Sequence, residues 1–489
     1  MKILEVSNTL GCQKVTGAEI LELASGEMSL PPVDSVALDL VYQSWKTAGR
    51  AAHRRQVYGR TTGVGANRDT QVEQQIDQDS RLLRSHATGA GEFVPHGTVR
   101  AAMLVRLNQL LAGGSGMHPA IIDALVASLD SDDLPRVHAS SSIGTGDLSQ
   151  FAEIGLGLIG EAALESGRVH TLWTPSVGDA LALISTNAMG IARGLLANQL
   201  FERWLDHCQA TACLALIATQ GSAEPFADQV HQARPQPGQA EVAADIRHLL
   251  RGHHWHPKRV QDSYGFRALP QVLGSARNAL NAYSTTLNIE LNSAAENPLV
   301  SAVDDDVFHN ANFHALPLAA ACDHSKLALA SAAQLSGRRL ANLTEPAITG
   351  LPPFLAGGPP GSSGIMLLEY IGAAALSRLR SAAFPATLGT TVISRGTEDH
   401  ASFGSQATDQ LHDCISAANE VLACELQAAV RALSLSKVSL DSSTPLGSYF
   451  LRARHHLNSS MVDRPLGDDH AAAVTFLRQP AGLKGNTDV

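Results

Sequence analysis

A glycine-containing tripeptide is the first candidate for chemistry. After the small residues 140–143 the chain reads Gly144, Thr145 and Gly146. Asp147 is a favoured N-cap residue and Gln150 completes a capping-box-like pair, so we expect a helix to begin at Leu148. The unpaired N–H groups and positive dipole end of that helix would stabilise an electrophile or an anion at the tripeptide. The same string is also typical of a flexible turn, and it lacks the Gly-Lys-Ser/Thr ending of a phosphate loop.

Tyr58 is the second candidate, because it lies in a stretch rich in glycine. Residues 57–65 read Val-Tyr-Gly-Arg-Thr-Thr-Gly-Val-Gly, and glycines allow such a loop to move. A mobile loop that presents one phenol would serve as a lid over a site.

Histidine and cysteine spacing predicts no metal site. His253, His254 and His256 are close in sequence, but adjacent histidines point in different directions and no carboxylate is spaced to join them. The six cysteines are scattered without a Cys-x-x-Cys pair, which is typical of free thiols in a reducing cytosol.

Composition favours a globular protein that acts on a small molecule. The chain has 489 residues, 44% of them hydrophobic and 17% charged, with a formal net charge of −10. An acidic balance argues against a nucleic-acid partner, since binding phosphates requires a basic face. The N-terminus lacks a signal-peptide pattern, and we find no apolar run of about 18 uncharged residues. We therefore expect a cytoplasmic protein that binds no membrane.

Long helices must position these candidates. The segments 271–295, 314–343 and 364–385 are Ala/Leu-rich and apolar on more than one face, which indicates helices inside a bundle. Strand patterns are few, with residues 2–6 one possibility, so we predict a mainly all-α fold: a long central helical bundle with a small mixed N-terminal region. We divide one continuous body into residues 1–200, with the Tyr58 lid loop and the Gly144–Gly146 loop, and residues 201–489, the long-helix bundle.

Motifs that follow one another along the chain point to a known family. They are Tyr58-Gly59-x-x-Thr62-Gly63-x-Gly65, Arg84-Ser85-His86, Gly144-Thr145-Gly146-Asp147-Leu148, Gln261-Asp262-x-Tyr264-x-x-Arg267, Glu290-Leu291-Asn292-Ser293-x-x-x-Asn297-Pro298, Asn312-Phe313-His314 and Glu398-Asp399-His400. Together, from about residue 55 to about residue 410, the sequence resembles the histidine, phenylalanine and tyrosine ammonia-lyases and aminomutases. The resemblance implies an all-α homotetramer whose active sites combine residues of several subunits.

The resemblance also implies a prosthetic group made from the backbone. The α-ammonium of an amino acid is a poor leaving group and its β-proton is barely acidic, so elimination needs a strong electrophile and a base. Family members cyclise Ala-Ser-Gly, with loss of two waters, to 4-methylideneimidazole-5-one. Here Gly144, Thr145 and Gly146 occupy those positions. Dehydrated Thr145 would carry an extra methyl group, and its β-branch restricts cyclisation. Two interpretations remain open: a modified working group, or chemistry without it.

Further roles come from the resemblance. Tyr58 matches the base that takes the β-proton; making its phenolate at neutral pH costs about 4 kcal/mol, which we expect nearby helix ends to supply. Arg267 matches the arginine that binds the substrate carboxylate, a task suited to guanidinium. Gln261 and Tyr264 match residues that bind substrate or prosthetic group, and they would share a face with Arg267 if this segment is helical.

The pocket residues suggest a substrate. Phe313 matches the aromatic residue beside the prosthetic group, while His86 and Glu398 resemble the histidine-specific branch. The sequence departs from the family pattern a second time, at the asparagine that orients the prosthetic group in the family. Here the asparagine is either replaced by Ser185 or shifted to Asn187.

We therefore predict an ammonia-lyase-like enzyme that acts on an aromatic L-amino acid, with L-histidine the best single choice. Three alternatives stay open at this point. The protein could be an aminomutase, a family member repurposed to work without the prosthetic group, or a non-catalytic member that binds an amino-acid-like ligand.

Overall fold

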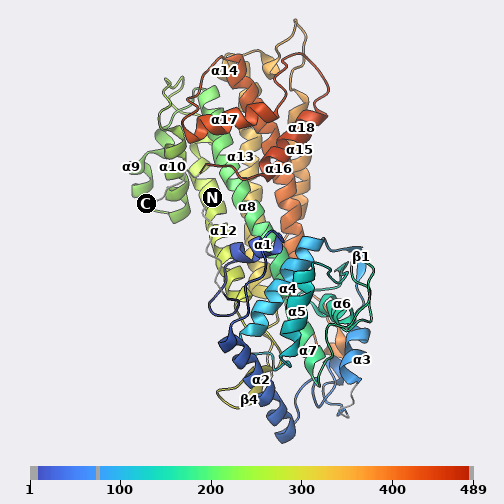
Figure 1. The fold of residues 1–489 in the computed structure, drawn as a ribbon. Coiled ribbons are helices and arrows are strands. Elements are labelled where there is room, and N and C mark those ends of the chain that lie inside the picture. Colours follow the sequence, from blue (N-terminus) through green and yellow to red (C-terminus); the bar gives the residue numbers. More distant parts are fainter. Residues whose placement is uncertain (1–8, 73–76, 484–489) are drawn as a thin grey trace.

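Residues 9–72 and 77–483 are described by a computed structural model. The described chain is mainly helical, as predicted, and a group of long helices runs side by side through the centre of the molecule (Figure 1). These are α8 (Ala188–Ala218), α12 (Leu269–Leu291), α13 (Leu316–Thr344), α15 (Leu367–Ala382) and α16 (Gly404–Leu435). The segments predicted at 271–295, 314–343 and 364–385 correspond to α12, α13 and α15. The possible strand at residues 2–6 lies outside the described residues.

The helix α16 is the central element of the bundle, because it packs against α8, α13 and α15. Alanines and leucines cover most of its faces and are buried, which lets the neighbouring helices approach closely. A buried ion pair joins it to α13: the Arg339 guanidinium donates two hydrogen bonds, of 2.6 and 2.8 Å, to the Glu425 carboxylate. Such a two-pronged pair fixes the register of the two helices.

One segment, Asp179–Ala218, is long and apolar enough to cross a membrane by length and composition. It includes α8, and 94% of its most apolar window is buried within the protein. Its hydrophobicity is accounted for by its place in the bundle, since a helix that is apolar all round is a core helix when other helices cover it.

Smaller elements gather at the two ends of the bundle (Figure 1). One end holds α2 (Ser35–Arg54), α3 (Gln78–His86), α4 (His96–Leu111), α5 (Ala120–Ser131), α6 (Leu148–Leu158) and α7 (Asp179–Ile184), with α1 (Gly17–Ala24) beside them. Two short antiparallel pairs complete this end: β1 (Ala90–Phe93) with β2 (His138–Ser140), and β3 (Leu299–Ser301) with β4 (Asp306–Phe308). We call it the mixed end.

The opposite end carries short helices, and we call it the distal end. They are α9 (Asp228–Ala233), α10 (Pro237–Leu250), α11 (Tyr264–Arg267), α14 (Pro346–Thr349), α17 (Pro445–His456) and α18 (Gly467–Arg478). The helix α8 runs through residue 200, and β3 and β4 pack on α2, so the mixed end also takes in residues from the second half of the chain.

The helix α6 begins at Leu148, as the sequence predicts, but the capping-box prediction is wrong. The Asp147 carboxylate accepts a 2.9 Å hydrogen bond from the Gly190 N–H in the first turn of α8. The Gln150 amide donates instead to the carbonyls of residues 138 and 139. Both side chains are buried, so donors and acceptors from other elements compete with the local cap.

Candidate active site

One cavity at the mixed end brings together predicted site residues from distant parts of the chain. Five of them line it: Tyr58, His86, Thr145, Phe313 and Glu398. They come from the helix α3 and from four loops, and they are up to 340 positions apart in sequence. The cavity holds about 1000 Å³ of empty space, including the solvent at its mouth, which is sufficient for an amino acid.

The tripeptide loop adopts a backbone that requires glycine. Gly144 and Gly146 have φ angles of +80° and +98°, in the left-handed region that other residues rarely adopt. The Ser142 hydroxyl accepts a hydrogen bond from the Gly144 N–H and donates one to the Gly146 carbonyl, both at 3.2 Å. This serine therefore holds the first and last residues of the tripeptide near each other, while Thr145 lines the cavity.

The Gly144 carbonyl oxygen has two donors. The Ala315 N–H lies 3.1 Å from it, and the Ser402 hydroxyl donates to it at 2.9 Å. A Cβ atom added to Gly144 would overlap the Ser402 hydroxyl and approach the Gly404 backbone nitrogen to 2.6 Å. Glycine at position 144 is therefore what allows this serine to reach the carbonyl.

The Tyr58 phenol is half-buried at the cavity wall. Its oxygen accepts a 2.7 Å hydrogen bond from the Gly65 N–H. Burial raises the pKa of Tyr58, and the Glu398 carboxylate adds to this rise, while the Gly65 N–H and the Arg68 guanidinium oppose it. Helix ends were expected to lower this pKa, but within one chain burial dominates and the phenol stays neutral at pH 7.

The loop that carries Tyr58 is anchored at its base by Arg60. This buried guanidinium donates to the Val177 carbonyl at 2.8 Å and to the Gly116 carbonyl. The Asp179 carboxylate beside it accepts from two backbone N–H groups, and burial raises its pKa to about 7.

The tip of the same loop is tied to a second loop, residues 391–398. The Ala66 N–H donates to the Ser394 hydroxyl at 3.2 Å, and the Arg68 guanidinium donates to the Thr397 hydroxyl at 2.7 Å. Since Glu398 belongs to this second loop, the two loops close one side of the cavity together.

The imidazole of His86 is oriented by its own helix. Its Nδ1 atom lies 2.9 Å from the Leu82 carbonyl, which can only accept a hydrogen bond. Nδ1 therefore donates to this carbonyl, and in that tautomer Nε2 is the acceptor of the ring. The half-buried Glu398 lines the same cavity and supplies a carboxylate.

Ser185, and not Asn187, lies at the cavity. Ser185 lines it, and its hydroxyl accepts from the Asn297 N–H at 3.0 Å. The Asn187 amide is turned away and donates to the Glu290 carboxylate at 3.3 Å. The helix α7 ends at Ile184 and α8 begins at Ala188, so the turn between them sends these two side chains to different neighbours.

Three predicted residues lie at the distal end of the same chain. Gln261 and Tyr264 are exposed, and the Arg267 guanidinium stacks on the Tyr264 ring at 4.3 Å from its centroid. Their helix α11 has only four residues, so Gln261 does not share a helical face with the other two.

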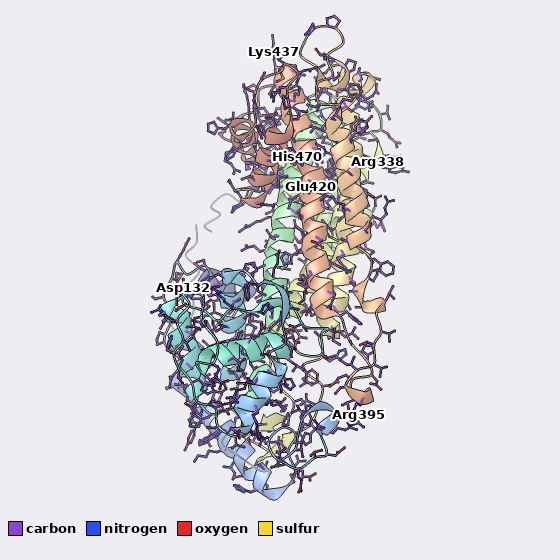
Figure 2. The ribbon with its side chains drawn as sticks, turned by 90° about the vertical axis from the view of Figure 1, so that its right-hand side faces the viewer. Asp132, Arg338, Arg395, Glu420, Lys437 and His470 are labelled. Carbon is purple, nitrogen blue, oxygen red and sulfur yellow. The ribbon has the colours of Figure 1, made fainter. Side chains whose placement is uncertain are left out.

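Figure 2 shows how far the distal residues are from the cavity. Arg338, which packs against Gly265 of α11, lies in the upper bundle, whereas Arg395, three residues before Glu398, lies at the mixed end. One chain therefore does not bring the predicted carboxylate-binding arginine to its own cavity.

No metal centre accompanies the cavity in residues 9–72 and 77–483. No group of three His, Cys, Asp or Glu side chains there is arranged to hold an ion. His253 lies 3.0 Å from the Thr444 hydroxyl, not beside another ligand.

Sequence reasoning missed Ser402 and Ser394. Ser402 follows the Glu398-Asp399-His400 motif by two positions, and Ser394 precedes it. A serine carries no signal of its own, and each of these acts on a backbone group of a distant segment. Only their place in the fold reveals them.

A helical bundle with a lid tyrosine above a glycine-rich backbone loop defines a class of carbon–nitrogen lyases. The family described as aromatic amino acid lyase matches residues 15–455. Histidine ammonia-lyase of Geobacillus kaustophilus is 34% identical over 447 residues, which cover 87% of this chain and 88% of that protein. The chain belongs to the aromatic amino acid lyase family.

Solved structures agree with this assignment. Tyrosine aminomutase from Streptomyces globisporus superimposes with a TM-score of 0.89 at 27% identity, covering 96% of each chain. The ergothioneine-degrading ergothionase from Treponema denticola reaches a TM-score of 0.90 at 23% identity, covering 96% of this chain and 98% of that one, and this likeness concerns the fold.

Proposed function

We propose that this lyase eliminates ammonia from L-histidine to give the 2-enoate. The observation that carries the proposal is that the cavity joins Tyr58, the phenol proposed to take the β-proton, with His86 and Glu398, two polar groups suited to an imidazole. The 34% identity to a histidine ammonia-lyase over most of both chains supports the same substrate.

The tripeptide fits a self-processed prosthetic group. Both glycines already hold the left-handed conformation, and Ser142 ties their backbones together. Gly144, Thr145 and Gly146 would form a methylideneimidazolone-type ring, which supplies an electrophile stronger than any side chain. The extra methyl group from Thr145 would face the cavity that Thr145 lines.

Tyr58 takes the β-proton of the substrate in this proposal. Its pKa is raised in the chain, so the phenolate must be favoured by the bound substrate. The Gly65 N–H already points at the phenol oxygen and would stabilise the charge there.

His86 and Glu398 select the substrate ring. The Nε2 atom of His86 accepts a hydrogen bond from an imidazole N–H, and the Glu398 carboxylate meets the imidazole or the ammonium. Phe313 closes the cavity with an aromatic face.

A second copy of the chain supplies Gln261, Tyr264 and Arg267. We propose a homotetramer, because large apolar side chains are exposed on the bundle: Leu327, Leu367, Tyr370, Phe384 and Leu388. Arg267 also has a buried Nε atom without a hydrogen-bond partner in the single chain, and it would bind the substrate carboxylate across the interface. A cytoplasmic location completes the proposal, since the buried cysteines are free thiols: Cys208, Cys213, Cys322, Cys414 and Cys424.

The direct test incubates the purified enzyme with L-histidine, L-tyrosine and L-phenylalanine. The expected result is a 2-enoate and ammonia from L-histidine, with much slower turnover of the other two. Preference for L-tyrosine or L-phenylalanine would contradict the role of His86 and Glu398, and no product from any of them would contradict the proposal as a whole.

An aminomutase is the second candidate. The contacts from Ala66 to Ser394 and from Arg68 to Thr397 close the loops over the cavity, and a sealed site would retain the enoate long enough for ammonia to return. A β-amino acid among the products would favour this candidate; free enoate alone would exclude it.

A further inference from the structure

We infer that the Ser402 hydroxyl and the Ala315 N–H form an oxyanion hole that drives the self-processing of Gly144–Gly146. This inference rests on the proposed function, because it concerns how the prosthetic group forms. It assigns Ser402, which belongs to none of the motifs in the sequence, a catalytic role in that reaction.

The two donors converge on one oxygen. The Ser402 hydroxyl lies 2.9 Å and the Ala315 nitrogen 3.1 Å from the Gly144 carbonyl oxygen. Ser402 is fully buried and Ala315 nearly so, which excludes water as a competing donor and strengthens both interactions. Both lone pairs of this oxygen therefore have a donor, an arrangement that also suits the extra charge of a tetrahedral species.

Each donor belongs to the N-terminus of a long helix. Ala315 is the N-cap residue of α13, which has 29 residues. The Ser402 oxygen accepts a 3.2 Å hydrogen bond from the N–H of Gly404, the first residue of α16, which has 32 residues. That bond leaves the hydroxyl proton for the Gly144 carbonyl. The positive ends of both helices therefore favour negative charge on this oxygen.

Glycine at position 144 is required for this arrangement of donors. In this backbone conformation an alanine Cβ would overlap the Ser402 hydroxyl. The Ser402 hydroxyl therefore reaches the Gly144 carbonyl because position 144 has no Cβ.

The reaction balances as follows. The Gly146 nitrogen attacks the Gly144 carbonyl carbon, the N–C bond forms, and the carbonyl electron pair moves to the oxygen held by Ser402 and Ala315. The proton from the Gly146 nitrogen ends on that oxygen. Loss of this hydroxyl with the Thr145 N–H proton gives a C=N bond and one water. Loss of the Thr145 hydroxyl with its Cα hydrogen gives a C=C bond and a second water.

The experiment follows processing by mass in the full-length chain. A short isotope-labelled pulse of cell-free synthesis sets time zero, and trypsin then releases residues 137–168, which contain the tripeptide between Arg136 and Arg168. The wild type, Ser402→Ala and Ser402→Cys are compared, with Ser405→Ala as the matched control, because Ser405 is buried in the same first turn of α16. Circular dichroism and light scattering establish that each variant folds and assembles like the wild type.

We expect the wild-type peptide to lose two waters and Ser402→Ala to do so about 100- to 1000-fold more slowly, the effect of removing one oxyanion-hole donor. Ser402→Cys keeps the side-chain connectivity with a larger and weaker donor and should also be slow. Ser405→Ala should match the wild type.

Three results would overturn the inference. Equal rates in all four proteins would remove Ser402 from the reaction and leave the proposed function intact. Equal slowing in Ser405→Ala would assign the effect to packing at the start of α16. A wild-type peptide that never loses water would refute both the inference and the ring in the proposed function. Since Ala315 donates from its backbone, Ala315→Pro removes the second donor; its φ of −82° lies close to the proline range, and it should slow processing independently.

Discussion

The absence of a side chain at position 144 determines how neighbouring residues pack against the loop. The family pattern has alanine there, yet the loop in this chain has a left-handed φ at Gly144, and the space of a Cβ is taken by Ser402. The glycine is therefore a requirement of this packing and not a neutral exchange.

We predict that Gly144→Ala, although it restores the residue of the family pattern, slows processing at least about tenfold. The left-handed backbone costs alanine about 1–2 kcal/mol, and the new Cβ displaces the Ser402 hydroxyl from the carbonyl. The mass of peptide 137–168 over time measures this effect. Faster processing than in the wild type would show that the loop relaxes to a different backbone.

At Tyr58 the prediction concerns pH. Because burial raises the pKa of this phenol above 10, only a small fraction is phenolate at neutral pH, and that fraction grows about tenfold per pH unit. We expect kcat/KM for L-histidine to rise with pH through about pH 9, and Tyr58→Phe to abolish elimination while ligand binding persists. A pH-independent rate in this range would contradict the assignment of the base, and so would unchanged turnover in Tyr58→Phe.

Among the elements, the loop at 57–72 is fixed at its base and at its tip by contacts with residues outside it. Arg60 anchors its base in the buried region beside Asp179, and Arg68 ties its tip to Thr397. Its glycines suggested a mobile lid; the contacts show a loop whose position depends on α7 and on residues 391–398.

The prediction for this loop uses Asp179, which lies beside its anchor Arg60. Its pKa is about 7 in the folded chain against about 4 unfolded, so folding favours the protonated carboxyl. The stability this group contributes is fully present below about pH 4 and is lost as pH rises through about 7. We expect the unfolding midpoint to fall between about pH 4 and about pH 7, and Asp179→Asn to flatten that fall.

We also expect Asp179→Asn to lower stability independently of pH, so its midpoints are compared with one another and not with those of the wild type. An amide cannot accept from both the His118 and Ser176 N–H groups as the carboxylate does, so its midpoint should be lower at every pH. The slope against pH is therefore the test, and a slope equal to that of the wild type would show that another group titrates.

At the scale of the whole molecule, Arg267 is separated from the cavity of its own chain. We therefore expect a complete active site to need more than one chain. Arg338, beside α11, and Arg395, beside the cavity loop, lie towards opposite ends of a bundle built from helices of up to 32 residues (Figure 2). A length of about 1.5 Å per residue puts these ends tens of ångströms apart, so one chain cannot use both Tyr58 and Arg267 on one substrate.

Mixed assemblies test the proposed sharing of sites. Tyr58→Phe and Arg267→Ala chains should each be inactive alone. If a site takes Tyr58 from one chain and Arg267 from another, hybrids formed by unfolding and refolding both variants together will contain some intact sites and regain a measurable fraction of activity. Light scattering gives the assembly mass. No recovery from hybrids of confirmed composition would contradict shared sites.

The sequence by itself determined the helices and the family. Periodic apolar residues predicted α12, α13 and α15 close to their bounds, because a helix that is buried on several faces must be apolar on them. The ordered motifs predicted Tyr58, His86, Thr145, Phe313 and Glu398, and these five do line one cavity.

Only the tertiary structure decided which backbone groups meet. It placed Ser185 and not Asn187 at the cavity, gave Asp147 a partner in α8 in place of its own helix, and set Ser402 on the Gly144 carbonyl. It also left Gln261, Tyr264 and Arg267 at the distal end. These outcomes depend on distances between segments far apart in the chain, and local residue preferences carry no information about such distances.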